Sequence, residues 1–280
     1  MLDRRRFLQI LGAVLTASGA GKAVAAVSGP AIIVAPTGLG SMGKAYTFLT
    51  APQIRFIEAA TSRLIPQDDL GPGALEADVP YFIDQQLGGA YGQGARAYMA
   101  GPWGEESEFQ GYQLPLTPAE LYRVGIAATD RYSQETYGKD FADLEPAEQD
   151  GVLKGLEDIS VDLRDVPAAT FFTTLLRDTK DGFFSDPGLG GNRDMAGWRL
   201  IGYPGVAAVY NDFIFQDNIP YTVEPVSIRT VREGAVEVDH HGHAVHRFAK
   251  VEDIVKTTPL ERKRVSEIGE GPSRGSNVIV

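Results

Sequence analysis

The sequence predicts a mainly α-helical protein: a compact helical domain with irregular Gly- and Pro-rich loops and a short C-terminal extension similar to a β-hairpin. Apolar residues recur at helical spacing between residues 50 and 181. Pro or Gly marks most ends of these segments, and strand-like segments follow only after about Tyr221. The chain has 280 residues, of which 43% are hydrophobic and 9% aromatic, so it can bury a core.

The first 25 residues have the composition of an export signal. Three arginines precede an apolar stretch from Ile10 to Ala20 and then Ala23-Val24-Ala25, a site that a signal peptidase could cleave. Twin arginines followed by Phe and Leu are typical of a Tat signal, which exports folded proteins. The alternative is an amphipathic helix or a short membrane anchor, but a spanning helix needs ~17–25 apolar residues. The residues assigned to the Tat motif are Arg4, Arg5, Phe7 and Leu8.

Residues 26–46 are rich in Gly, Ala and Ser, and we expect a linker or arm there, followed by a helical domain over residues 47–225. The first helix of that domain is expected to begin at Thr50, where Gln53 completes a capping box. Pro66 is expected to end it, because Pro cannot donate a helical hydrogen bond.

A second helix is expected after Asp78, closing at Gly88-Gly89, and the stretch 100–116 is turn-rich and irregular. The strongest local signal is Thr117-Pro118-Ala119-Glu120. It combines an N-cap, a Pro at the first helical position and a Glu three residues after the cap. The third helix is therefore expected to begin at Thr117 and to end at Gly138.

The fourth helix is expected to begin at Pro146, and the fifth to begin at Pro167 and to end before Gly182. Residues 226–280 are expected to form a C-terminal extension that is partly flexible. Strand-like composition covers residues 221–232, 235–238 and 244–251, with a hairpin turn about His241-Gly242.

The composition excludes several classes of site. The chain has no cysteine, which removes disulfides, thiolate-bound zinc, iron–sulfur clusters, attached c-type haem and thiol nucleophiles. A formal net charge of -11 argues against binding bare nucleic acid. The glycine-dense stretch 188–192 follows no strand and continues neither as a P-loop nor as a dinucleotide fingerprint.

All four histidines lie close together, at His240, His241, His243 and His246. Imidazoles in such a cluster suit Zn, Ni or Cu, but alternation along a strand would divide them between two faces. We therefore favour a solvated His-rich turn and predict no metal site. The acidic clusters 105–108 and 68–69 have no spacing that brings a pair to one cleft, so no catalytic residue is predicted.

The segment 181–205 combines many glycines with large aromatic and arginine side chains, which are typical anchors of protein interfaces. The part from Phe183 to Tyr203 is the predicted partner surface. The alternative is that its Phe and Trp side chains close the bottom of the core, while Asn192 and Asp194 satisfy backbone groups of a turn. The candidate anchors are Phe183, Phe184, Arg193, Trp198, Arg199 and Tyr203.

The stretch FFTTLLRDTKDGFFSDPGLGGNRDMAGWRLIGYPG, from Phe171 to Gly205, resembles the signature of the gluconate 2-dehydrogenase subunit 3 family. The leader, the LTPAELY helix start and the Pro66 break also fit, and the resemblance covers roughly residues 48–225. It implies a non-catalytic small subunit, without a cofactor of its own, of a periplasmic sugar or sugar-acid dehydrogenase attached to the cytoplasmic membrane through its partners.

The partners that the resemblance implies are a large FAD-dependent flavoprotein of the glucose–methanol–choline type and usually a multihaem cytochrome c. FAD and haem c would lie in those subunits, and the small subunit would carry the Tat leader for the pair. The substrate stays open among gluconate, 2-ketogluconate, glucose, sorbitol and a glycoside. Two other classes compete: a stand-alone periplasmic sugar- or polyol-binding protein, motivated by Trp103, Tyr112 and Trp198, and a hydrolase that depends on a metal or on carboxylates.

Overall fold

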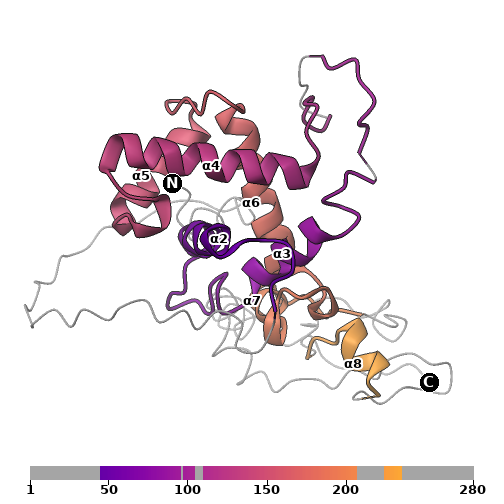
Figure 1. The fold of residues 1–280 in the computed structure, drawn as a ribbon. Helices are drawn as coiled ribbons and strands as arrows, with labels where there is room; N and C mark the ends of the chain where they lie inside the picture. The colour runs from indigo at the N-terminus through magenta and orange to yellow at the C-terminus, as the bar shows by residue number, and fades with distance from the viewer. Residues whose placement is uncertain (1–44, 96, 105–109, 207–223, 235–280) are drawn as a thin grey trace, which may run out of the picture.

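Helices make up the regular structure in the described part of the chain. The computed structural model describes residues 45–95, 97–104, 110–206 and 224–234 (Figure 1). Its helices are α2 (Ala51–Leu64), α3 (Val79–Gly88), α4 (Pro118–Tyr137), α5 (Pro146–Glu157), α6 (Ala168–Phe184), α7 (Ala196–Ile201) and α8 (Ile228–Arg232), with short 3-10 turns η1 (Phe141–Asp143), η2 (Pro187–Leu189) and η3 (Arg193–Met195). The described residues form isolated β-bridges but no named strand. The predicted mainly α class is confirmed.

Helix α6 is the central element of the domain. It contacts α4 and α5 towards one end and α3 and α7 towards the other, and α2 also packs against it (Figure 1). Phe171, Phe172, Leu175 and Phe183 recur at helical spacing along its buried face. Burying this stripe against several helices removes much more apolar surface from water than a single pairing would.

Aromatic side chains fill the core around α6. The ring of Phe56 in α2 lies 4.8 Å from that of Phe141 in η1, measured between centroids. Tyr122 of α4 meets Phe171 of α6 edge-to-face at 5.9 Å. All four side chains are completely buried, so they join helices that are far apart in the sequence.

The predicted helix starts at Thr50 and Thr117 are confirmed, and each carries a capping box. The backbone N–H of Thr50 donates to Gln53 at 3.0 Å. The backbone N–H of Thr117 donates to the Glu120 carboxylate at 2.8 Å, and Glu120 N–H donates back to the Thr117 hydroxyl at 3.3 Å. These reciprocal bonds satisfy donors that the first helical turn leaves without intrahelical partners.

The segment before α2 is held against α3 by one buried carboxylate. Asp84 accepts hydrogen bonds from the backbone N–H groups of Thr47, Phe48 and Leu49 at 2.8–3.0 Å. The Asp84 side chain is fully buried, and these donors replace the water that it loses. The folded domain therefore extends to residues N-terminal of its first described helix.

Helix α6 continues past the predicted stop at Gly182 and ends at Phe184. Gly182 faces α3, where a Cβ atom would lie 2.8 Å from the Phe82 ring. The glycine is therefore required for the close approach of two helices rather than for termination. The short helix α7 was not predicted, because its six residues are too few to show a clear period.

The predicted strand over residues 221–232 is wrong for residues 228–232, which form α8. Ser227 caps this helix through reciprocal bonds with Thr230, both 3.0 Å long, and this local capping outweighs the β-branched composition. Val226 makes only an isolated parallel bridge with Gly205. The other predicted strands and the hairpin turn lie outside the described residues.

Asp130 of α4 accepts a hydrogen bond from the backbone N–H of Phe141 at 3.0 Å and so fixes the turn that leads into η1. Burial raises the pKa of its carboxyl to about 6, and the nearby Asp140 and Asp143 add to the rise against the opposing bond from Phe141 and the charge of Arg55. The folded protein therefore holds this proton more tightly than the unfolded chain.

The stability of the Asp130→Asn variant relative to the wild type should increase as pH rises. A raised carboxyl pKa contributes stability below about pH 4, and that contribution is lost as pH rises through about 6. Asn keeps the acceptor for Phe141 but carries no charge. Melting temperatures of both proteins from pH 4 to 7.5 test this, and a difference that does not change with pH would contradict it.

Candidate functional site

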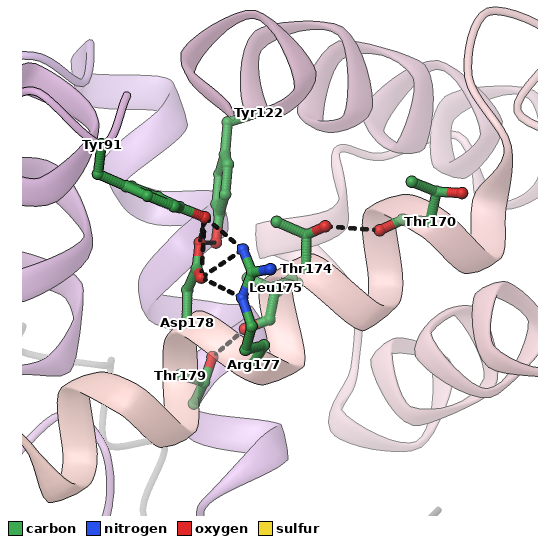
Figure 2. Close-up of polar contacts among 8 residues, drawn as sticks. All are labelled: Tyr91, Tyr122, Thr170, Thr174, Leu175, Arg177, Asp178 and Thr179. Atoms are coloured by element: carbon green, nitrogen blue, oxygen red, sulfur yellow. Dashed lines mark hydrogen bonds and ion pairs between the residues drawn. The ribbon is translucent and has the colours of Figure 1, made fainter. Parts of the chain in front are cut away.

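A buried polar cluster lies where α6 meets α4 and the turn after α3 (Figure 2). The hydroxyl of Tyr122 donates to Asp178 at 2.9 Å, and that of Tyr91 lies 2.9 and 3.0 Å from its two oxygens. Arg177 donates to the same carboxylate from Nε and Nη2, both at 3.1 Å, and to the Tyr91 hydroxyl. Both oxygens of Asp178 are thus hydrogen-bonded.

Burial dominates the electrostatics of this cluster. Asp178 is only 5% exposed, and loss of water raises the pKa of its carboxyl above the ordinary value although Arg177 and both tyrosines oppose the rise. Burial, followed by the charge of Asp178, raises the pKa of the Tyr122 and Tyr91 hydroxyls. Both tyrosines therefore remain neutral donors at physiological pH.

The remaining polar groups on this part of α6 are satisfied within the helix. Thr174 donates to the carbonyl oxygen of Thr170 at 2.8 Å, and Thr179 donates to that of Leu175 at 2.7 Å (Figure 2). The cluster therefore has its donors and acceptors paired with one another. Such an arrangement suits the locking of three chain segments together better than proton transfer to a substrate.

The segment after α6, residues 185–206, is fastened back onto that helix by buried polar contacts. Asn192 is fully buried, donates to the carbonyl oxygen of Ser185 at 2.8 Å and accepts from the backbone N–H of Gly197 at 2.8 Å. Trp198 donates from Nε1 to the carbonyl oxygen of Phe184, also at 2.8 Å. These contacts return the chain against the end of the helix that it has just left.

Close packing also requires the glycine of the AGW sequence. A Cβ atom at Gly197 would lie 2.1 Å from the carbonyl oxygen of Phe183, nearer than two such atoms can approach. A larger residue there would push α7 off α6. Part of the glycine-rich pattern therefore serves the fold itself.

The structure divides the six candidate interface residues into two groups. Phe183 and Trp198 are buried, as the alternative of core closure expects, and Phe184 packs edge-to-face on Phe183 at 5.2 Å. The other three keep accessible surface: Tyr203 is 47% exposed, and the side chains of Arg193 and Arg199 are 42% and 39% exposed.

Arg193 makes an internal ion pair with a residue that the sequence did not suggest. Its Nη1 atom lies 3.4 Å from the buried carboxylate of Asp78, and Asp194 is more distant at 4.0 Å. Its backbone N–H also donates to the carbonyl oxygen of Ala77 at 3.1 Å. Arg193 therefore links residues 115 positions apart while half of its side chain remains accessible.

The Asp178 cluster was missed in the sequence, although one signal was present. Asp178 follows Phe171 and Leu175 at helical spacing, which places an acid on an apolar face. Its tyrosine partners lie 87 and 56 residues away, and no local pattern relates them. The Tat motif and the histidine cluster lie outside the described residues, so their predictions stand as predictions.

Two further observations concern the part of the chain that the structure describes. No group of three or more His, Asp or Glu side chains is arranged there to hold a metal ion. No helix in the same part is long and apolar enough to cross a membrane.

A small helical domain does not by itself define a function, so the class of protein is taken from comparison with known families. Residues 51–205 match the family model of gluconate 2-dehydrogenase subunit 3. The chain belongs to this family, and it is an accessory subunit of that type. Membership implies that it forms part of a multisubunit dehydrogenase complex. Comparisons with curated proteins and with solved structures found no match.

Replacing Asp178 by Ala should lower the free energy of unfolding by about 2–4 kcal/mol, because the buried hydroxyl of Tyr122 loses its acceptor. Asp178→Asn keeps an acceptor and should cost less. Asp181→Ala, at an exposed position of the same helix, is the matched control and should change stability by less than about 0.5 kcal/mol. Urea denaturation measures all three, and equal stability of Asp178→Ala and the control would show that the cluster does not lock the fold.

Proposed function

We propose that this chain is the non-catalytic small subunit of a membrane-associated FAD-dependent sugar or sugar-acid dehydrogenase. In this proposal it assists folding and assembly of a large flavoprotein of the glucose–methanol–choline type and carries it through the Tat pathway. The family match over residues 51–205 is the observation that carries the proposal, and the twin-arginine leader supports the export role. FAD belongs to the large subunit, and haem c to a multihaem cytochrome subunit at the membrane.

The described structure is compatible with a scaffold of this kind. The buried ionisable cluster around Asp178 joins helices through satisfied hydrogen bonds. A partner that must be exported folded needs a stable carrier, and Tat transport accepts only folded cargo. The absence of cysteine from the sequence fits folding in the reducing cytoplasm before export.

Replacing Arg4 and Arg5 together by Lys should retain both this chain and the flavoprotein in the cytoplasm, because the Tat machinery reads the arginine pair. Arg6→Lys is the matched control and should leave export intact. Fractionation followed by mass spectrometry and a dehydrogenase assay locates both subunits. Normal periplasmic activity of the Arg4→Lys/Arg5→Lys variant would contradict co-export through this leader.

The chain purified alone should show no flavin or haem absorbance and no dye-linked dehydrogenase activity on sugars or sugar acids. The complete complex, assayed in parallel, should show both absorbances and the activity. A yellow chromophore that stays with the isolated chain through gel filtration would overturn the assignment of FAD to the large subunit. Sugar titration of the same sample by calorimetry tests the alternative of a binding protein.

A further inference from the structure

Several exposed apolar side chains lie on the last part of the family signature and on α8, which contacts it. Seven large hydrophobic residues are exposed in the described part of the chain. Three of them lie in the signature, and the fourth is the first residue of α8; each is about half exposed, and we call the four the signature-end surface. They are Leu189 (55%), Ile201 (50%), Tyr203 (47%) and Ile228 (47%).

Hydrogen bonds hold the segments that carry these four residues against one another. The backbone N–H of Ile228 donates to the Asp186 carboxylate at 2.7 Å, which ties α8 to η2. The chain after α7 is joined to the chain before α8 by two backbone bonds: Val206 N–H donates to the carbonyl oxygen of Val226 at 2.7 Å, and Val226 N–H donates to that of Pro204 at 3.0 Å. Tyr203 lies edge-to-face on Trp198 at 5.2 Å. The four side chains are therefore presented by a fixed framework.

The net charge of this end differs from that of the rest of the domain. Residues 45–184 contain 23 acidic and 10 basic residues. The segments 185–206 and 224–234 contain four of each and are neutral together. Charged residues are about as frequent in both parts, so this end differs in having no net charge. Interface centres are enriched in apolar, aromatic and arginine side chains, and this end exposes side chains of all three kinds.

We propose that the signature-end surface binds the large flavoprotein subunit, an inference that rests on the proposed function and names the face that performs it. The partner surface that fits it is apolar and carries little net charge. A second copy of this chain is a poorer occupant, because the net charge of -11 makes two copies repel each other. The glycines and buried aromatics of the signature build the framework, and its accessible residues make the contact.

The test compares two pairs of substitutions that add the same charge. Ile201→Lys/Leu189→Lys changes the signature-end surface. Ile159→Lys/Tyr98→Lys changes residues that are 70% and 69% exposed in other parts of the domain. The native complex is purified through a tag on this chain, the flavoprotein is separated and recognised by its FAD absorbance, and each variant is titrated against it. Melting temperatures and sedimentation of each isolated chain are measured alongside.

We expect the signature-end variant to bind the flavoprotein at least about tenfold more weakly, because a few apolar anchors carry most of an interface's affinity. The control pair should bind as the wild type does, and both variants should melt at the wild-type temperature. Equal affinity of the two variants would overturn the inference. So would a lower melting temperature with unchanged affinity, which would mean that the surface is covered by the chain itself.

Two remaining outcomes separate this inference from the proposed function. If the wild-type chain sediments as a dimer that the signature-end variant loses, while flavoprotein binding is unchanged, the surface joins two copies and the inference fails alone. If the tagged wild-type chain retains no flavoprotein, the proposed function fails, and the inference fails with it.

Discussion

Helix α6 has to bury an apolar stripe and an ionisable carboxyl on the same face, and the arrangement of the domain follows from that requirement. Apolar burial brings α2, α3, α4 and α5 around the helix. Asp178 can enter this core only if donors replace its lost water. Tyr91 and Tyr122 supply those donors from two other segments, so the polar requirement fixes which segments meet α6 and where.

The family signature has a double role in this structure. Asn192, Gly197 and Trp198 return the chain against the end of α6 through buried contacts and a close backbone approach. A sequence pattern that is expected to mark a binding surface is therefore largely a pattern for folding. What it offers a partner is the set of side chains that the folded segment leaves accessible, Tyr203 among them.

The structure is compatible with the place of this chain in a dehydrogenase complex as an accessory subunit. The described acidic and tyrosine side chains around α6 are paired with one another, so their chemistry serves stability. In the proposed complex, reaction chemistry belongs to the flavoprotein, while this domain supplies a stable body, a neutral apolar face and an export leader.

The sequence by itself determined the helical class and most helix starts, because caps such as Thr50 with Gln53 and Thr117 with Glu120 act over three residues. It also carried the family signature. Tertiary structure decided what depends on distant partners: Gly182 lies inside α6 because Phe82 packs there, and Trp198 is buried. Arg193 pairs with Asp78, and Asp178 meets Tyr91 and Tyr122, across 56 to 115 residues. Local signals set where a helix begins, but only packing brings together side chains that no sequence spacing relates.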